Sequence, residues 1–179
     1  MSWCTLRTRV VYENRWIRVR EDAVRRPDGA DGLYGVVETR GPSVFVCALT
    51  DADELVLVEQ ERYPTGTRSL ELPAGNSEGE EPLEAARREL REETGLLASA
   101  WRLLGELESM NGICDERQRV YLARELRESG SDRAAEDGIT AVRTVPFAEA
   151  LRMVADGEIV DGQSVSSLAL AAIALGRCA

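Results

Sequence analysis

The chain lacks two residue types altogether, because its 179 residues include no histidine and no lysine. Without histidine, a Ser-His-Asp or Cys-His triad, an imidazole general base and a zinc site built on imidazole are excluded. Acid–base chemistry must therefore come from carboxylates, tyrosine, cysteine or water bound to a metal. Without lysine, all 22 basic side chains are arginines, so arginine is the only side chain that can hold a phosphate by charge.

Cysteine is scarce as well. Cys4, Cys47, Cys114 and Cys178 include no Cys-x-x-Cys pair, and no N-terminal segment has the charged start, apolar core and cleavage site of a signal peptide. We therefore expect reduced thiols in a cytoplasmic protein. The C-terminal apolar run, residues 165–175, is about half as long as a membrane span requires, so a packing helix is expected there.

Positive charge is also in deficit. The 32 acidic residues outnumber the 22 basic ones, which gives a net charge of −10. No basic excess is available to displace counterions from phosphates, so we expect neither nucleic acid nor a membrane surface as a partner. With 44% hydrophobic residues, a chain of this length can form one globular domain with its own core and a small extra element.

Alternating apolar and polar residues predict most of the secondary structure. Strands at 4–11, 15–24 and 33–38 predict an N-terminal antiparallel element over residues 1–40. Over residues 41–179 we expect strands at 43–49, 54–60, 69–72, 100–108, 118–125 and 140–145, and helices at 82–94, 147–156 and 164–176. Residues 126–138 are polar and predict an exposed loop. The predicted fold class is α/β (α+β), with a mixed sheet between helices.

The helix predicted at 82–94 carries the main candidate site. Glu89, Glu92 and Glu93 stand at i, i+3 and i+4, so three carboxylates share a face that is expected to look outward. Like charges at this spacing repel by roughly 0.2–0.5 kcal/mol per pair, which favours a hard divalent cation against them. The opposite face is apolar, is expected to pack on a sheet, and consists of Leu83, Ala86 and Leu90.

The stretch from Gly75 to Leu96 resembles the Nudix box, G-x5-E-x7-R-E-U-x-E-E-x-G-U, in which U is an aliphatic residue. Its second half matches at Arg88, Glu89, Leu90, Glu92, Glu93, Gly95 and Leu96. Glu80 takes the place of the first glutamate. Only four residues separate it from Gly75, so the loop is one residue shorter than the pattern.

Three flanking segments, 58–64, 71–75 and 112–116, resemble in order and spacing the ADP-ribose pyrophosphatase branch of the Nudix hydrolases. One position departs, since Asn111 stands before Gly112 where that branch commonly has proline. The resemblance implies a Nudix fold that hydrolyses a nucleoside diphosphate linked to another moiety, with ADP-ribose, cleaved to AMP and ribose 5-phosphate, as first choice. The alternatives are a nucleotide sugar such as GDP-mannose, or a non-catalytic nucleotide-sugar binding module.

The metal ligands follow from the chemistry of this substrate. A diphosphate linkage repels an incoming water, so Mg2+ or Mn2+ must neutralise its charge, and Glu89, Glu92 and Glu93 supply hard oxygen ligands. The resemblance adds the backbone carbonyl of Ala74 as a ligand. Arg88 is expected to hold a box glutamate in a bidentate pair. Glu93 and Arg88 are therefore expected to take part in catalysis as well as in shaping the site.

The remaining site residues are expected from other parts of the chain. Glu116 is the candidate general base, because its loop could fold over the metal and because the resembled branch carries a catalytic glutamate there. Arg62 matches a family arginine and is the candidate for clamping a phosphate or the terminal ribose. Candidates for stacking on the base are Trp16, Tyr34 and Trp3.

Each of these residues also has a structural alternative. Glu116 could be an ordinary acid in an exposed loop, Arg62 a partner in a surface ion pair, and the aromatic residues part of the core. For the chain as a whole, the resemblance implies that the N-terminal strands reach across a homodimer.

Overall fold

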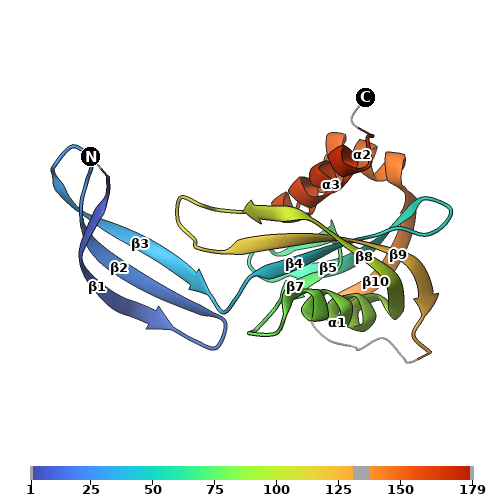
Figure 1. Cartoon of the computed structure of the whole chain (residues 1–179), viewed down its shortest axis with the longest axis horizontal. Coiled ribbons are helices and arrows are strands. Elements are labelled where there is room, and N and C mark those ends of the chain that lie inside the picture. Colours follow the sequence, from blue (N-terminus) through green and yellow to red (C-terminus); the bar gives the residue numbers. More distant parts are fainter. Residues whose placement is uncertain (1, 131–137, 178–179) are drawn as a thin grey trace.

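The computed structural model of the protein describes residues 2–130 and 138–177, and it confirms the predicted mixture of sheets and helices (Figure 1). In chain order the elements are β1 (Cys4–Glu13), β2 (Ile17–Arg25), β3 (Asp31–Thr39), β4 (Ser43–Ala48), β5 (Glu54–Arg62), β6 (Thr67–Glu71), β7 (Ala74–Asn76), α1 (Pro82–Thr94), β8 (Leu96–Glu108), β9 (Arg117–Glu128), β10 (Ile139–Pro146), α2 (Phe147–Ala155) and α3 (Gly162–Ala174).

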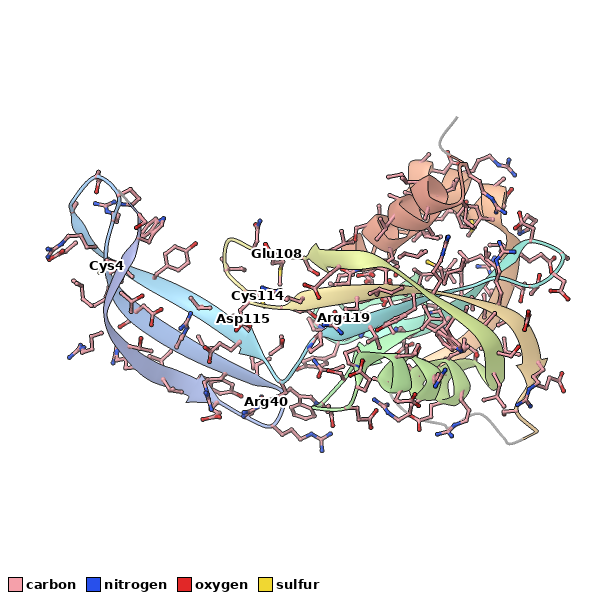
Figure 2. All side chains as sticks on the ribbon, viewed as in Figure 1. Cys4, Arg40, Glu108, Cys114, Asp115 and Arg119 are labelled. Atoms are coloured by element: carbon pink, nitrogen blue, oxygen red, sulfur yellow. The ribbon has the colours of Figure 1, made fainter. Side chains whose placement is uncertain are left out.

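The first three strands form an antiparallel sheet of their own, in the order β1-β2-β3. This sheet projects from the rest of the molecule, and every residue of β1 is exposed (Figure 1). The chain passes from β3 into the main body at a junction where Arg40 lies (Figure 2). The N-terminal sheet therefore meets the main body mainly through its end and not through a broad face.

The main body contains two further sheets. One has the order β7-β4-β9-β8, in which β4 and β9 are parallel and the other pairs antiparallel. The second is antiparallel and has the order β10-β5-β6. The helix α1 lies on one side of these sheets, and α2 and α3 lie on the other (Figure 1). The predicted sandwich of a mixed sheet between helices is thus confirmed.

The central strand β4 contributes to both cores, because alternate side chains of a strand point to opposite faces. Phe45 packs in a cluster with Leu168 of α3, whereas Val44 and Val46 pack in a cluster with Leu90 of α1. All six residues of β4 are buried. A strand that is covered on both faces reads in the sequence as a continuous apolar run, as this one does.

The helix α1 begins and ends where its terminal residues favour it. Pro82 lies in the first turn, where its missing N–H costs nothing. Gly95 follows the last residue in the left-handed conformation, with φ of 74°, and its N–H donates to the Arg91 carbonyl at 2.8 Å. The residues that α1 buries are Pro82, Ala85, Ala86 and Leu90. Leu83, expected on the apolar face, is half-buried at its edge.

Some predicted boundaries are wrong. β8 begins at Leu96 and β9 ends at Glu128, because the two strands pair from Leu96 opposite Glu128 onward. Residues 126–128 therefore belong to a strand and not to the predicted loop, whose residues 131–137 lie outside the described residues. In the parts of the chain that the structure describes, no helix is long and apolar enough to cross a membrane.

Candidate active site

A cavity of about 790 Å³ lies beside α1, which contributes Arg88, Glu89, Glu92 and Glu93 to its lining. Other walls come from the segment 74–80 that precedes the helix, from the end of β5, and from the turn between β1 and β2. Three segments that are distant in the sequence therefore meet around the carboxylates of α1.

The approach of β7 to α1 leaves room for no side chain at position 75. A Cβ on Gly75 would lie 1.9 Å from Oε1 of Glu89. The backbone conformation of Gly75 is not of the left-handed kind, so glycine is favoured here by the position of the Glu89 carboxylate and not by torsion. The Glu89 carboxylate thus rests against the strand, and its side chain is only 13% exposed. Glu89 was expected to look outward from the packed face of the helix, and it faces the cavity although it is largely buried.

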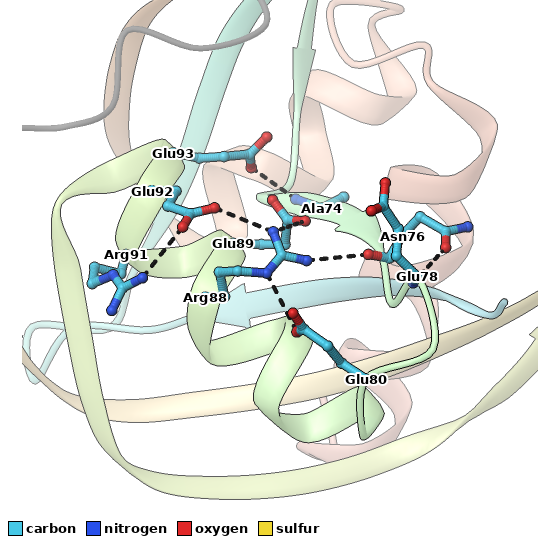
Figure 3. Close-up of polar contacts among 9 residues, drawn as sticks. All are labelled: Ala74, Asn76, Glu78, Glu80, Arg88, Glu89, Arg91, Glu92 and Glu93. Carbon is cyan, nitrogen blue, oxygen red and sulfur yellow. Dashed lines mark hydrogen bonds and ion pairs between the residues drawn. The ribbon is translucent and has the colours of Figure 1, made fainter. Parts of the chain in front are cut away.

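Arg88 links the loop to the helix (Figure 3). Its Nη1 donates to Glu89 Oε1 at 2.8 Å and to Glu92 Oε2 at 3.2 Å, its Nε donates to Glu80 Oε2 at 3.3 Å, and its Nη2 donates to the Asn76 carbonyl at 3.2 Å. The expected bidentate pair with one glutamate is replaced by single contacts to three. The carboxylates are therefore not a bare repelling group, because a guanidinium already lies among them.

The charge on Arg88 is secured by these neighbours. Burial lowers the pKa of the Arg88 guanidinium, but Glu89 and the other carboxylates raise it by more, so the group stays charged. Glu93 behaves differently, because partial burial raises its pKa to about 8 although the Ala74 N–H, which donates to it at 2.9 Å, lowers it. A carboxyl group with that pKa holds a proton at neutral pH, and a bound cation would displace the proton.

The donor chemistry of this wall fits a hard divalent cation. Glu89, Glu92 and Glu93 line one cavity and offer oxygen atoms, which Mg2+ and Mn2+ prefer. Within residues 2–130 and 138–177, however, no three acidic or cysteine side chains are already gathered as a metal-binding cluster. Arg88 holds Glu89 and Glu92, and Glu93 faces the Ala74 N–H. Cation binding would require these side chains to turn from their present partners.

Arg62 lies in the same cavity and is oriented by a buried acid. Its Nε and Nη2 donate to the two carboxylate oxygens of Glu71 at 2.9 and 2.5 Å, and Gln60 Nε2 also donates to Glu71 at 3.2 Å. Glu71 is 1% exposed, whereas the Arg62 side chain is 46% exposed. Because one partner is fully buried, this is not the loose surface ion pair considered as the alternative.

The turn between β1 and β2 brings Trp16 to the cavity. Oδ1 of Asn14 accepts the N–H groups of Trp16 and Ile17, both at 2.8 Å, which fixes the turn. Trp16 is 57% exposed, so it is not a core residue. Its neighbour Arg15 also lines the cavity, with its guanidinium carbon 4.1 Å from the Trp16 ring centroid. Sequence reasoning missed Arg15, because nothing distinguishes it from the other arginines.

Glu116 and the other aromatic candidates lie elsewhere. Glu116 lines a separate cavity of about 440 Å³, where Nε2 of Gln163 in α3 donates to its Oε2 at 3.2 Å. The hydroxyl of Tyr34 donates to the Gly112 carbonyl at 2.6 Å, and Trp3 contacts the Tyr34 ring edge-on at 5.4 Å. The loop of Glu116 thus docks against β3 and α3, and Glu116 does not line the cavity beside α1.

Comparison with known proteins gives consistent matches. A family model described as the NUDIX domain matches residues 39–166, and one described as the nucleoside diphosphate sugar hydrolase N-terminal domain matches residues 3–37. An ADP-ribose pyrophosphatase of Mycobacterium tuberculosis is 39% identical over 96% of this chain and 84% of its own length. A methanol dehydrogenase activator of Bacillus methanolicus is 32% identical over 90% of this chain and 88% of its own length.

Among solved structures, the crystal structure of an ADP compounds hydrolase matches with a TM-score of 0.85 and covers 99% of this chain and 97% of its own. The two sequences are 22% identical, so this match concerns the fold alone.

The contact between Gly75 and Glu89 can be tested by Gly75→Ala. The new methyl group must push the Glu89 carboxylate aside, and that side chain is flexible enough to move without unfolding the protein. We expect the Mn2+ affinity measured by calorimetry to fall by about tenfold or more, a loss typical of misplaced metal ligands. The free energy of unfolding in urea should change by less than about 1 kcal/mol.

Gly112→Ala is the matched control, because a Cβ there meets nothing within 4 Å. It should leave both quantities unchanged. Unchanged Mn2+ affinity in Gly75→Ala would show that the position of Glu89 does not matter for cation binding.

Proposed function

This chain belongs to the NUDIX family and is a pyrophosphohydrolase of nucleoside diphosphate compounds, and on that premise we propose that its substrate is ADP-ribose, cleaved to AMP and ribose 5-phosphate. The observation that carries the proposal is the composition of one cavity, in which the carboxylates of α1, the oriented Arg62 and the exposed ring of Trp16 lie together. Such a cavity offers charge for a diphosphate beside an aromatic surface for a base.

We propose that Glu89, Glu92 and Glu93, with the carbonyl of Ala74, hold Mg2+ or Mn2+. The cation would supply neutralisation of the diphosphate charge and activation of water. Arg88 contacts Glu89 and Glu92 in the absence of a cation, and it would remain beside them and offset their charge while their carboxylates turn to the cation. Its additional contact with the Asn76 carbonyl anchors it to the loop, so it need not leave when the cation arrives.

On the substrate side, we propose that Arg62 binds a phosphate or the terminal ribose and that Trp16 stacks on the base. The bidentate pair with Glu71 holds Arg62 in one orientation, which lowers the entropic cost of binding an anion. The Tyr34 hydroxyl donates to the Gly112 carbonyl, and Tyr34 lines a smaller cavity of about 310 Å³ together with Glu116 and not the cavity beside α1.

We further propose that the protein is a homodimer joined through its N-terminal sheet. The large apolar side chains that this sheet leaves about half exposed or more include Trp3, Leu6, Val10, Val11, Tyr12 and Leu33. Large apolar side chains left exposed in this number favour contact with another protein surface. A second copy of the chain would bury them and bring another N-terminal sheet close to the main body.

For the compartment, the cytoplasm remains our proposal. In the part of the chain that the structure describes, Cys4, Cys47 and Cys114 are free thiols. Free thiols are compatible with a reducing environment.

The substrate can be tested with the purified protein and a panel that contains ADP-ribose, GDP-mannose and other nucleotide sugars. We expect release of AMP from ADP-ribose in Mg2+ or Mn2+, loss of this activity in EDTA, and a kcat/KM for ADP-ribose at least about tenfold above that for GDP-mannose. Faster cleavage of GDP-mannose would assign the chain to that substrate. Absence of turnover across the whole panel with either metal would contradict the proposed reaction.

We propose Glu116 as the general base. Its loop would leave Gln163 and bring the Glu116 carboxylate to the cavity beside α1. Glu116→Gln should then lower kcat by ~10²–10⁴ with metal affinity nearly intact, because an amide cannot accept the proton. Glu108→Gln is the matched control, since Glu108 lines the same 440 Å³ cavity. A loss below about tenfold in Glu116→Gln would move the role to another carboxylate, with Glu93 next because it already lines the site.

A further inference from the structure

Three arginines line the cavity beside α1, and they differ in their partners. Arg62 is engaged by Glu71, and Arg88 by Glu80, Glu89 and Glu92. Arg15 forms no ion pair with any residue that the structure describes, and its guanidinium lies over the ring of Trp16. Of the three, Arg15 is thus the one without an ion-pair partner among the residues that the structure describes.

The position of Arg15 is set by its turn. Asn14 caps the turn through its side chain, and Nη2 of Arg40 donates to the Asn14 carbonyl at 2.8 Å. The same nitrogen of Arg40 pairs with Glu13 at 2.8 Å. Because Arg40 lies at the junction with the main body, these bonds tie the turn to the chain that leads into β4 (Figure 2). Arg15 is therefore held at the cavity by a turn whose conformation is fixed by hydrogen bonds.

The charge balance of the cavity favours a role for Arg15 in binding an anion. Its acidic lining residues are Glu78, Glu80, Glu89, Glu92 and Glu93. They outnumber the arginines, so a diphosphate entering the cavity needs positive charge on more than the α1 side. A cation on an exposed aromatic ring is held more weakly than a guanidinium bonded to a phosphate. A phosphate in the cavity would therefore draw Arg15 away from Trp16.

We propose that Arg15 binds a phosphate of the nucleoside diphosphate, and that the movement of Arg15 away from Trp16 uncovers the face of the Trp16 ring for the base. The inference rests on the proposed function, because it takes the cavity beside α1 as the substrate site. In this proposal Arg15 binds the charged phosphate of the substrate, and its neighbour Trp16 stacks on the base. Binding of the diphosphate and stacking of the base are thereby coupled.

The test uses binding, so that it does not depend on turnover. Calorimetry in Mg2+ measures the affinities for inorganic pyrophosphate and for ADP. Arg15→Gln should weaken both by about tenfold, the loss expected for one charge-assisted contact. Trp16→Ala should lower the affinity for ADP but change the affinity for pyrophosphate by no more than about twofold, since only ADP has a base to stack on the ring. Arg7→Gln, which removes an exposed arginine of β1 that does not line the cavity, should change neither.

Unchanged pyrophosphate affinity in Arg15→Gln would overturn the inference, even if ADP is weakened, because Arg15 would then act on the base. No measurable binding of pyrophosphate by the unsubstituted protein would overturn it as well. Hydrolysis of ADP-ribose is assayed separately. If ADP-ribose is not cleaved while Arg15→Gln still lowers the affinity for pyrophosphate, the proposed function fails and the assignment of Arg15 stands.

Discussion

The close approach of β7 to α1 is the constraint on which the site depends. Gly75 allows the Glu89 carboxylate to rest against the strand, and the N–H of the preceding Ala74 donates to Glu93. Arg88 completes the link from the helix to the loop. Since β7 pairs with β4, whose side chains contribute to both cores, the carboxylates are positioned by the most buried part of the molecule. A rigid support of this kind suits a site that must orient a reaction.

The rest of the cavity is built by the end of β5 and by the turn between β1 and β2. The end of β5 presents Arg62 through the buried Glu71, and the turn between β1 and β2 presents Arg15 and Trp16 from a sheet that projects into solvent. The wall proposed to bind the cation is therefore fixed by the core, whereas the walls proposed to bind the phosphate and the base depend on side-chain networks. This division allows substrate preference to change without disturbing the carboxylates.

The parts of the site that were predictable from the sequence are local. The bounds of the helix α1 and the shared face of Glu89, Glu92 and Glu93 were predicted from the sequence, and both are present. Arg88 was expected to hold one box glutamate in a bidentate pair, and it makes single contacts with Glu80, Glu89 and Glu92 instead. Its charge offsets part of the repulsion expected among the carboxylates of α1. Long-range contacts carried no local signal. Glu116 bonds to Gln163, 47 residues away, so its separation from the cavity beside α1 could not be read from the spacing of residues.

The central claim is that the carboxylates of α1 exchange their contacts with Arg88 and Ala74 for a divalent cation. The most direct measurement is a crystal structure of the protein soaked in Mn2+, with the ion located by its anomalous scattering. We expect an anomalous peak among Glu89, Glu92 and Glu93, with oxygen atoms of these residues at metal–ligand distance. A peak located only elsewhere, or none at saturating Mn2+ while Arg88 keeps its present partners, would contradict the claim.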